Sequence, residues 1–144
     1  MDRELHFRKL ENLYLSAPIN DFYNPTLKVE EGASTIEVSI RPDFFHAANP
    51  VHGSVYFKML DDAAFFAVHS FVSDVFIVTV SFNTYLTRPI STGELRSVGK
   101  VVHQGQRIFI AEAELTDNLG QQLARGSGTF IRSKIPLSPE VGYR

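Results

Sequence analysis

Apolar residues recur at two different periods along this chain, and the two periods predict two kinds of secondary structure. Residues 2–15 and 53–71 carry apolar side chains three or four positions apart, which is typical of helices. Most other segments alternate apolar and polar residues, as strands do, and turns containing glycine or proline separate them. The expected strands are residues 26–30, 34–41, 75–87, 94–103, 107–116 and 122–132.

The segment 53–71 is apolar on nearly every side, and its only solvent-facing strip would be Lys58 and Asp62. A helix of this kind is buried. One long helix packed against an antiparallel sheet is an α+β arrangement. We therefore predict an α+β domain in which about six strands wrap around a central helix. Because such a sheet leaves its edge strands unpaired, edge-to-edge pairing of two copies is expected.

The whole chain, residues 1–144, is of a length that suits one domain. Residues 1–25 are expected to form an N-terminal helix and a loop, and residues 134–144 a poorly ordered tail. We find no internal repeat, low-complexity run or linker that would divide the chain.

Composition excludes several classes of function. The chain has no cysteine, so it has no disulfide, thiol nucleophile or cysteine-bound zinc. Its histidines show no metal-binding spacing, and we predict no metal site. The net charge of −2 predicts neither nucleic acid nor membrane as a partner. No stretch resembles a signal peptide or a membrane span, so a cytoplasmic location is expected.

Candidate chemistry begins with Asp61, a carboxylate in the middle of the apolar helix. Such a group is costly unless it is paired or functional, and burial would raise its pKa toward the range useful for acid–base work. We assign Lys58 to Asp62 as a surface ion pair, which leaves Asp61 to the interior. A purely structural Asp61, bonded to a neighbouring strand or subunit, is the alternative.

The start of the same helix is the second candidate, because its first N–H groups lack internal partners and favour negative charge. Gly53 would let a carbonyl oxygen approach them closely, as an oxyanion site requires. His52, just before the helix, is either a capping residue or part of that site. In the following strand, the alternation places Thr79, Ser81 and Asn83 on one face, which is either solvent-exposed or a polar wall near the carboxylate.

The run from His52 to Asp62, HGSVYFKMLDD, resembles the signature of hotdog-fold thioesterases of the phenylacetate-degradation (PaaI-like) group. That signature is His-Gly-Gly, with a carboxylate nine residues after the histidine. Residues 78–94 and the Gly-Gln-Arg at 105–107 resemble later parts of the same family, so the likeness spans roughly residues 35–132.

The resemblance implies a homodimer with two sites at the subunit interface, often paired into tetramers. It implies hydrolysis of an acyl-CoA substrate with no metal or organic cofactor. Asp61 would act as general base or nucleophile across the interface, and the Gly53 N–H would polarise the thioester carbonyl. His52 would position the thioester, and Thr79 would assist the nucleophile or water.

Two positions depart from the family pattern. Ser54 replaces the second glycine and still supplies a backbone N–H. Where the family often has Asn or Gln, six residues before the motif histidine, this chain has His46, with Asn49 nearby. Either His46 or Asn49 would orient the water or the carbonyl.

Substrate contacts are predicted less specifically. Phe65 would line an apolar acyl pocket or belong to the core, and Arg88, Arg107 and Arg125 are candidates for the CoA phosphates. Two other functions compete with the thioesterase: an acyl-thioester dehydratase or hydratase, and a non-catalytic protein that binds acyl-CoA.

Overall fold

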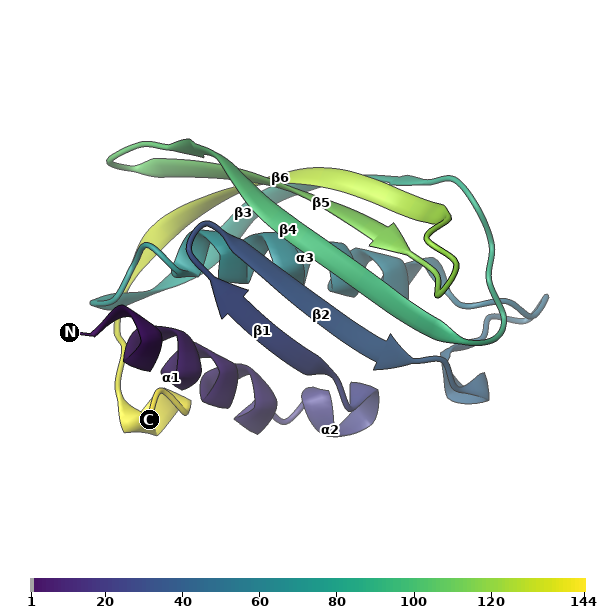
Figure 1. The fold of residues 1–144 in the computed structure, drawn as a ribbon, viewed down its shortest axis with the longest axis horizontal. Coiled ribbons are helices and arrows are strands. Elements are labelled where there is room, and N and C mark those ends of the chain that lie inside the picture. The colour runs from purple at the N-terminus through teal and green to yellow at the C-terminus, as the bar shows by residue number, and fades with distance from the viewer. Residues whose placement is uncertain (1) are drawn as a thin grey trace.

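A computed structural model describes residues 2–144, and these form one sheet with a long helix against it (Figure 1). The helices are α1 (Arg3–Ser16), α2 (Asn20–Tyr23) and α3 (Gly53–His69), with 3-10 turns η1 (Pro42–Phe44) and η2 (Pro139–Val141). The strands are β1 (Thr26–Glu30), β2 (Ala33–Ser39), β3 (Val75–Leu86), β4 (Glu94–Gln104), β5 (Ile108–Thr116) and β6 (Gln122–Pro136).

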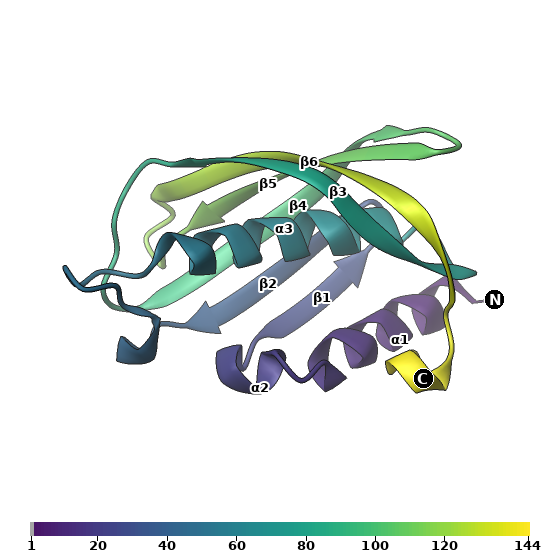
Figure 2. The ribbon, with the colours of Figure 1, turned by 180° about the vertical axis from the view of Figure 1, so that it is seen from behind.

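The six strands lie in the order β1-β2-β4-β5-β6-β3, and every neighbouring pair is antiparallel. The sheet curves around α3, as seen from behind in Figure 2. This confirms the predicted α+β arrangement of about six strands around a central helix. The helix ends at His69, two residues before the expected end, and the His69 Nδ1–H donates to the Val72 carbonyl (3.0 Å) in the turn that follows.

Small residues on the inner face of the sheet let α3 approach closely. A Cβ added to Gly99 on β4 would overlap the carbonyl oxygen of Ala63, so only glycine fits against the helix backbone there. On β6, Gly126 and Gly128 leave space for the ring of Phe82 on β3. The contact at Gly99 lets α3, the helix that carries Asp61, lie close to the sheet.

We expect Gly99→Ala to lower the free energy of unfolding by about 1–3 kcal/mol, because the added methyl forces the sheet and α3 apart. Urea denaturation of wild type and variant measures the difference. The exposed Ser127→Ala on β6 is the control, with an expected change below about 0.5 kcal/mol. Equal stability of Gly99→Ala and wild type would contradict the close contact.

The two edges of the sheet differ in how they are covered. At β1, Glu11 on α1 accepts a hydrogen bond from the Val29 N–H (2.9 Å), and Arg8 donates to the Val29 carbonyl (3.1 Å). Arg8 and Glu11 also pair with each other at 2.8 Å. At the other edge, β3 is hydrogen-bonded to β6 on one side only. The β3 edge is therefore the one left open for pairing.

The prediction that residues 134–144 form a poorly ordered tail is wrong. β6 continues to Pro136, and the following residues pack beside α1 (Figure 2). The His6 Nε2–H donates to the His69 carbonyl (2.9 Å), so the His6 Nδ1 accepts from the Tyr143 hydroxyl (2.7 Å). The buried Tyr143 ring and this hydrogen bond hold the tail in place. The prediction was based on the two prolines of the tail, which do not indicate either contact.

Candidate active site

Asp61 lies in the middle of α3 and is half-buried. Its Oδ1 accepts a hydrogen bond of 2.9 Å from the Thr79 hydroxyl on β3. Burial raises the pKa of Asp61 to about 6, although the hydrogen bond from Thr79 acts in the opposite direction. The carboxyl group is thus poised to exchange a proton near neutral pH.

A β-bulge brings Thr79 to Asp61. The pairing of β3 with β6 shifts register between Thr79 and Ser81, and Val80 is the extra residue, with 58% of its surface exposed. Thr79 therefore faces α3 together with Phe82, while Ser81 and Asn83 are exposed. The prediction that Thr79, Ser81 and Asn83 share one face is wrong, because simple alternation does not survive the bulge.

The N-terminus of α3 is capped by the preceding histidine. The His52 Nδ1 accepts hydrogen bonds from the Ser54 N–H (3.0 Å) and the Ser54 hydroxyl (2.8 Å). This confirms the capping interpretation of His52 and leaves its catalytic part a prediction. Within residues 2–144, the Gly53 N–H has no acceptor, so it is available to a ligand.

A cleft of about 300 Å³ opens beside Gly53. His46 and Arg88 line this cleft, together with Tyr56, whose hydroxyl donates to the Arg88 carbonyl (2.7 Å). The His46 Nδ1 accepts from the Ala48 N–H (3.1 Å), so a neutral His46 carries its proton on Nε2. Asn49 does not line the cleft; it is exposed and adopts a left-handed turn conformation, with φ of 58°.

Gly53 and Asp61 cannot act on the same atom within one chain. They are eight residues apart on one helix, which separates them by roughly 12 Å along its axis. A reacting carbonyl would have to lie about 3 Å from both groups. A site that used both groups would therefore need them from two different chains.

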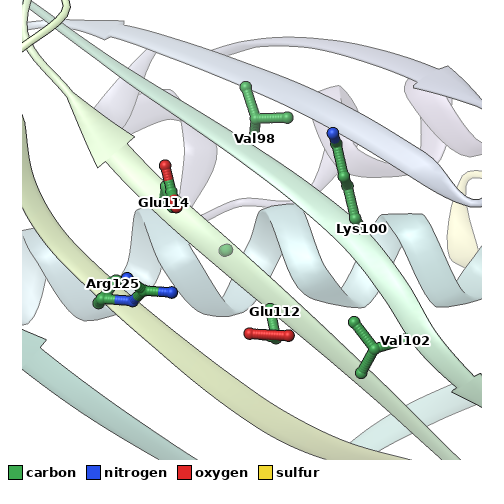
Figure 3. Close-up of a pocket in the computed structure, with 7 residues that line it drawn as sticks. Val98, Lys100, Val102, Glu112, Glu114 and Arg125 are labelled. Carbon is green, nitrogen blue, oxygen red and sulfur yellow. The ribbon is translucent and has the colours of Figure 1, made fainter.

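The remaining predicted residues lie elsewhere. Arg125 is on the outer face of the sheet, in a hollow of about 290 Å³ with Lys100, Glu112 and Glu114 (Figure 3). Arg107 is exposed in the turn between β4 and β5. Neither lies beside Asp61 or Gly53, and their contacts with CoA stay a prediction.

Phe65 belongs to an aromatic cluster behind Asp61. Its ring is partly buried and lies 5.0–6.2 Å, between ring centroids, from four others: Phe66, His69, Phe76 and Phe130. This supports the core interpretation of Phe65, one turn of α3 away from the carboxylate.

The Lys58–Asp62 pair is confirmed, with Nζ and Oδ2 2.7 Å apart, but its surface location is wrong. The two side chains are only 13% and 19% exposed. The Tyr14 hydroxyl on α1 donates to the same Asp62 oxygen (2.7 Å). Sequence reasoning missed Tyr14, although its place on the apolar side of the N-terminal helix indicated that it faces the core.

No three His, Asp or Glu side chains within residues 2–144 are grouped so that they could hold a metal ion. None of the helices in this part of the chain has the length and apolar character required to cross a membrane.

Residues 49–124, more than half of the chain, match the family model of the Thioesterase superfamily. The chain belongs to the thioesterase superfamily. A protein of Thermoplasma acidophilum, named for a proposed esterase activity, is 26% identical over 71% of this chain and 77% of its own length. A protein of Mycobacterium tuberculosis, named in the same way, is 30% identical over 62% of this chain and 67% of its own. The superfamily and these names indicate a hydrolase.

Solved structures confirm the hotdog fold. The Escherichia coli PaaI protein of the phenylacetic acid degradation operon superimposes with a TM-score of 0.85, at 17% identity, over 94% of this chain and 99% of its own. The PaaI protein of Thermus thermophilus gives 0.73 at 18% identity, over 81% and 100%. At identities this low, the superpositions establish the fold alone.

Proposed function

We propose that this protein hydrolyses acyl-CoA thioesters to the free acid and CoA. The observation that carries the proposal is the half-buried Asp61, whose carboxyl is hydrogen-bonded by Thr79 and has a pKa raised by burial to about 6. A base with this pKa is largely ionised at neutral pH yet can hold a proton during the reaction.

In the proposed reaction, ionised Asp61 removes a proton from water as the water oxygen attacks the thioester carbonyl carbon. The carbonyl oxygen gains negative charge, which the Gly53 N–H and the dipole of α3 stabilise. The tetrahedral intermediate collapses, the C–S bond breaks, and the proton on Asp61 passes to the leaving CoA sulfur. Direct attack by Asp61 is the other route, and it also needs the ionised carboxylate.

We further propose that the working unit is a homodimer in which each site takes Asp61 from one chain and Gly53 from the other. The separation of roughly 12 Å along α3 supports this, because it prevents both groups of one chain from reaching one carbonyl. The open edge of β3 is where a second copy would pair, and exposed apolar side chains surround it: Phe57, Val80, Tyr85 and Leu86. A tetramer built from two such dimers is a further expectation.

Subunit mixing tests the shared site. The variants Asp61→Asn and Gly53→Pro should each be inactive alone. In a heterodimer, one site receives both defects and the other receives none. Equal amounts, unfolded together and refolded, should therefore recover about a quarter of wild-type activity, since half of the dimers are mixed and each has one intact site. No recovery, with dimers confirmed by light scattering, would overturn the shared site.

His46 and Arg88 line the Gly53 cleft, and Arg88 is the arginine that we propose for a CoA phosphate. His46 facing the cleft also favours a second candidate function, a hydratase that pairs a histidine with a carboxylate. Incubating the protein with an unsaturated acyl-CoA separates the two functions. A hydratase consumes the double bond without releasing thiol, and a thioesterase releases thiol.

Thr79→Val should shift the acid limb of the pH–rate profile upward. Valine removes the hydrogen bond that favours the ionised Asp61, so the pKa of Asp61 rises above about 6 and activity at pH 6 falls more than activity at pH 8. The measurement is kcat/KM for thiol release between pH 5 and about pH 9. Thr84→Val on the same strand is the control, and a downward or absent shift in Thr79→Val would contradict the role of the hydroxyl.

A further inference from the structure

Asp62, the residue next to Asp61, is held by a side chain from α1 and another from α3. One oxygen of Asp62, Oδ2, accepts from the Tyr14 hydroxyl and from Lys58 Nζ, each at 2.7 Å. Tyr14 belongs to α1, outside residues 49–124 that match the superfamily. The N-terminal helix therefore contacts the catalytic helix one residue from the proposed base.

Aromatic rings hold the lysine in place. The Lys58 ammonium lies 5.3 Å from the ring centre of Tyr14 and 4.9 Å from that of Tyr23 on α2. Charges shielded in this way from solvent act on their neighbours more strongly than surface charges do. Both the negative Asp62 and the positive Lys58 are thus effective at Asp61.

We propose that Asp62, held by Tyr14 and Lys58, is a positioning residue that sets the pH at which Asp61 gains and loses its proton. The inference rests on the proposed function of Asp61, and it assigns a role in catalysis to the N-terminal helix. Asp62 and Asp61 are consecutive residues, so they project from α3 about 100° apart and do not share a face. Asp62 therefore acts on Asp61 through its charge.

Few charged or titratable groups face Asp61 from the surrounding elements of residues 2–144. Lys58 and Asp62 lie on α3 itself and Tyr14 on α1, while β3 contributes the neutral Thr79 hydroxyl. Tyr23 on α2 acts on Asp62 rather than on Asp61. Beyond burial and Thr79, the Asp62 charge raises the pKa of Asp61 and the Lys58 charge lowers it. Burial and the Asp62 charge raise the pKa of Tyr14, so Tyr14 stays protonated and remains a donor.

The two charges predict opposite effects when each is removed. Asp62→Asn should lower the pH at which Asp61 titrates by about half a unit to one unit, and Lys58→Met should raise it by a similar amount. The double variant Lys58→Met/Asp62→Asn should return to within about 0.3 units of wild type. Lys58→Met leaves a buried carboxylate unpaired, and if it fails to fold, Asp62→Asn and the double variant still decide the question.

Two independent readouts are needed. Carbon NMR of the labelled aspartates follows the titration of Asp61 without substrate, with Asp61→Asn identifying its signal. The pH profile of thiol release follows the same proton in catalysis. If no acyl-CoA is hydrolysed, the NMR titration still tests the role of Asp62, so failure of the proposed function and failure of this inference are distinguishable.

Lys100→Met and Glu112→Gln are the matched controls, because these residues are exposed neighbours on the outer face of the sheet. They alter charge in the same way and should leave the Asp61 titration within about 0.2 units of wild type. Opposite shifts in the single variants and cancellation in the double variant would establish the inference. Shifts in the same direction, or none larger than in the controls, would overturn it and leave Asp62 a structural anchor for α1.

Discussion

Replacing Asp61 by asparagine should reduce kcat for thiol release by roughly 10²–10⁴-fold, the contribution typical of a positioned acid–base group. Asparagine has nearly the same shape and can still accept the hydrogen bond from Thr79, but it neither removes a proton nor attacks a carbonyl. The measurement is thiol release from short, medium, long and aromatic acyl-CoAs, with wild type and variant side by side. The same panel identifies the preferred acyl group.

Thermal stability provides the control for this variant. The pKa of Asp61 in the folded protein is about 6, above its ordinary value of 3.8, so the folded state binds a proton more readily than the unfolded chain. The resulting stabilisation is present at low pH and is lost as the pH rises through about 6. At pH 8 the ionised carboxylate therefore destabilises the folded state, and Asp61→Asn should have a higher Tm than wild type.

Loss of activity together with a higher Tm cannot come from unfolding, which makes the pair of measurements decisive. A folded Asp61→Asn variant with full activity would exclude Asp61 as base or nucleophile. If wild type itself releases no thiol from any substrate, the hydratase and the acyl-CoA-binding protein become the leading functions.

The fold was predictable because its elements are long and their patterns are strong. The helix at residues 53–71 is apolar on nearly all sides, and the six strands are bounded by clear turns. Asp61 was conspicuous for the same reason, as a carboxylate within an apolar segment. These inferences needed only local periodicity and the cost of burying charge.

The parts that sequence missed depend on contacts between distant residues. The bulge at Val80 is a feature of pairing between β3 and β6. Without it the side chains of Thr79 and Ser81 would lie on the same face of β3. Tyr14 and Asp62 are 48 positions apart, and His6 and Tyr143 are 137 apart. No local pattern encodes such pairs, so the buried Lys58–Asp62 pair was expected at the surface and the tail was expected to be loose.

In the proposed dimer, Gly53 and Asp61 of one chain each work with the other group from the second chain. A single chain positions the Asp61 carboxyl on the β3 side of α3 and the Gly53 amide at the helix start, roughly 12 Å away along the axis. In the proposed dimer, pairing along the open β3 edge would bring the Gly53 amide of one chain to the Asp61 carboxyl of the other. The N–H of Gly53 is therefore the group whose removal tests the oxyanion half of the site.

Gly53→Pro should reduce kcat by roughly 10²–10³-fold, because proline lacks the N–H that would bind the developing oxyanion. The backbone accepts proline here: Gly53 is the first residue of α3, where proline is favoured, and its N–H has no acceptor within residues 2–144 to lose. His52, with φ of −63° and ψ of 142°, already has the extended conformation that a residue before proline adopts.

Gly53→Ala is the matched control. Alanine and proline both add a Cβ, which would lie 2.9 Å from the Cδ1 of Leu86, a flexible and exposed side chain, but only alanine keeps the N–H. Alanine should stay within about tenfold of wild type, since the loss of one oxyanion donor is the larger effect. Equal losses in the two variants would mean that crowding at Leu86, rather than the missing donor, controls the rate. A large loss confined to proline would identify the amide at the start of α3 as the group that stabilises the reacting carbonyl.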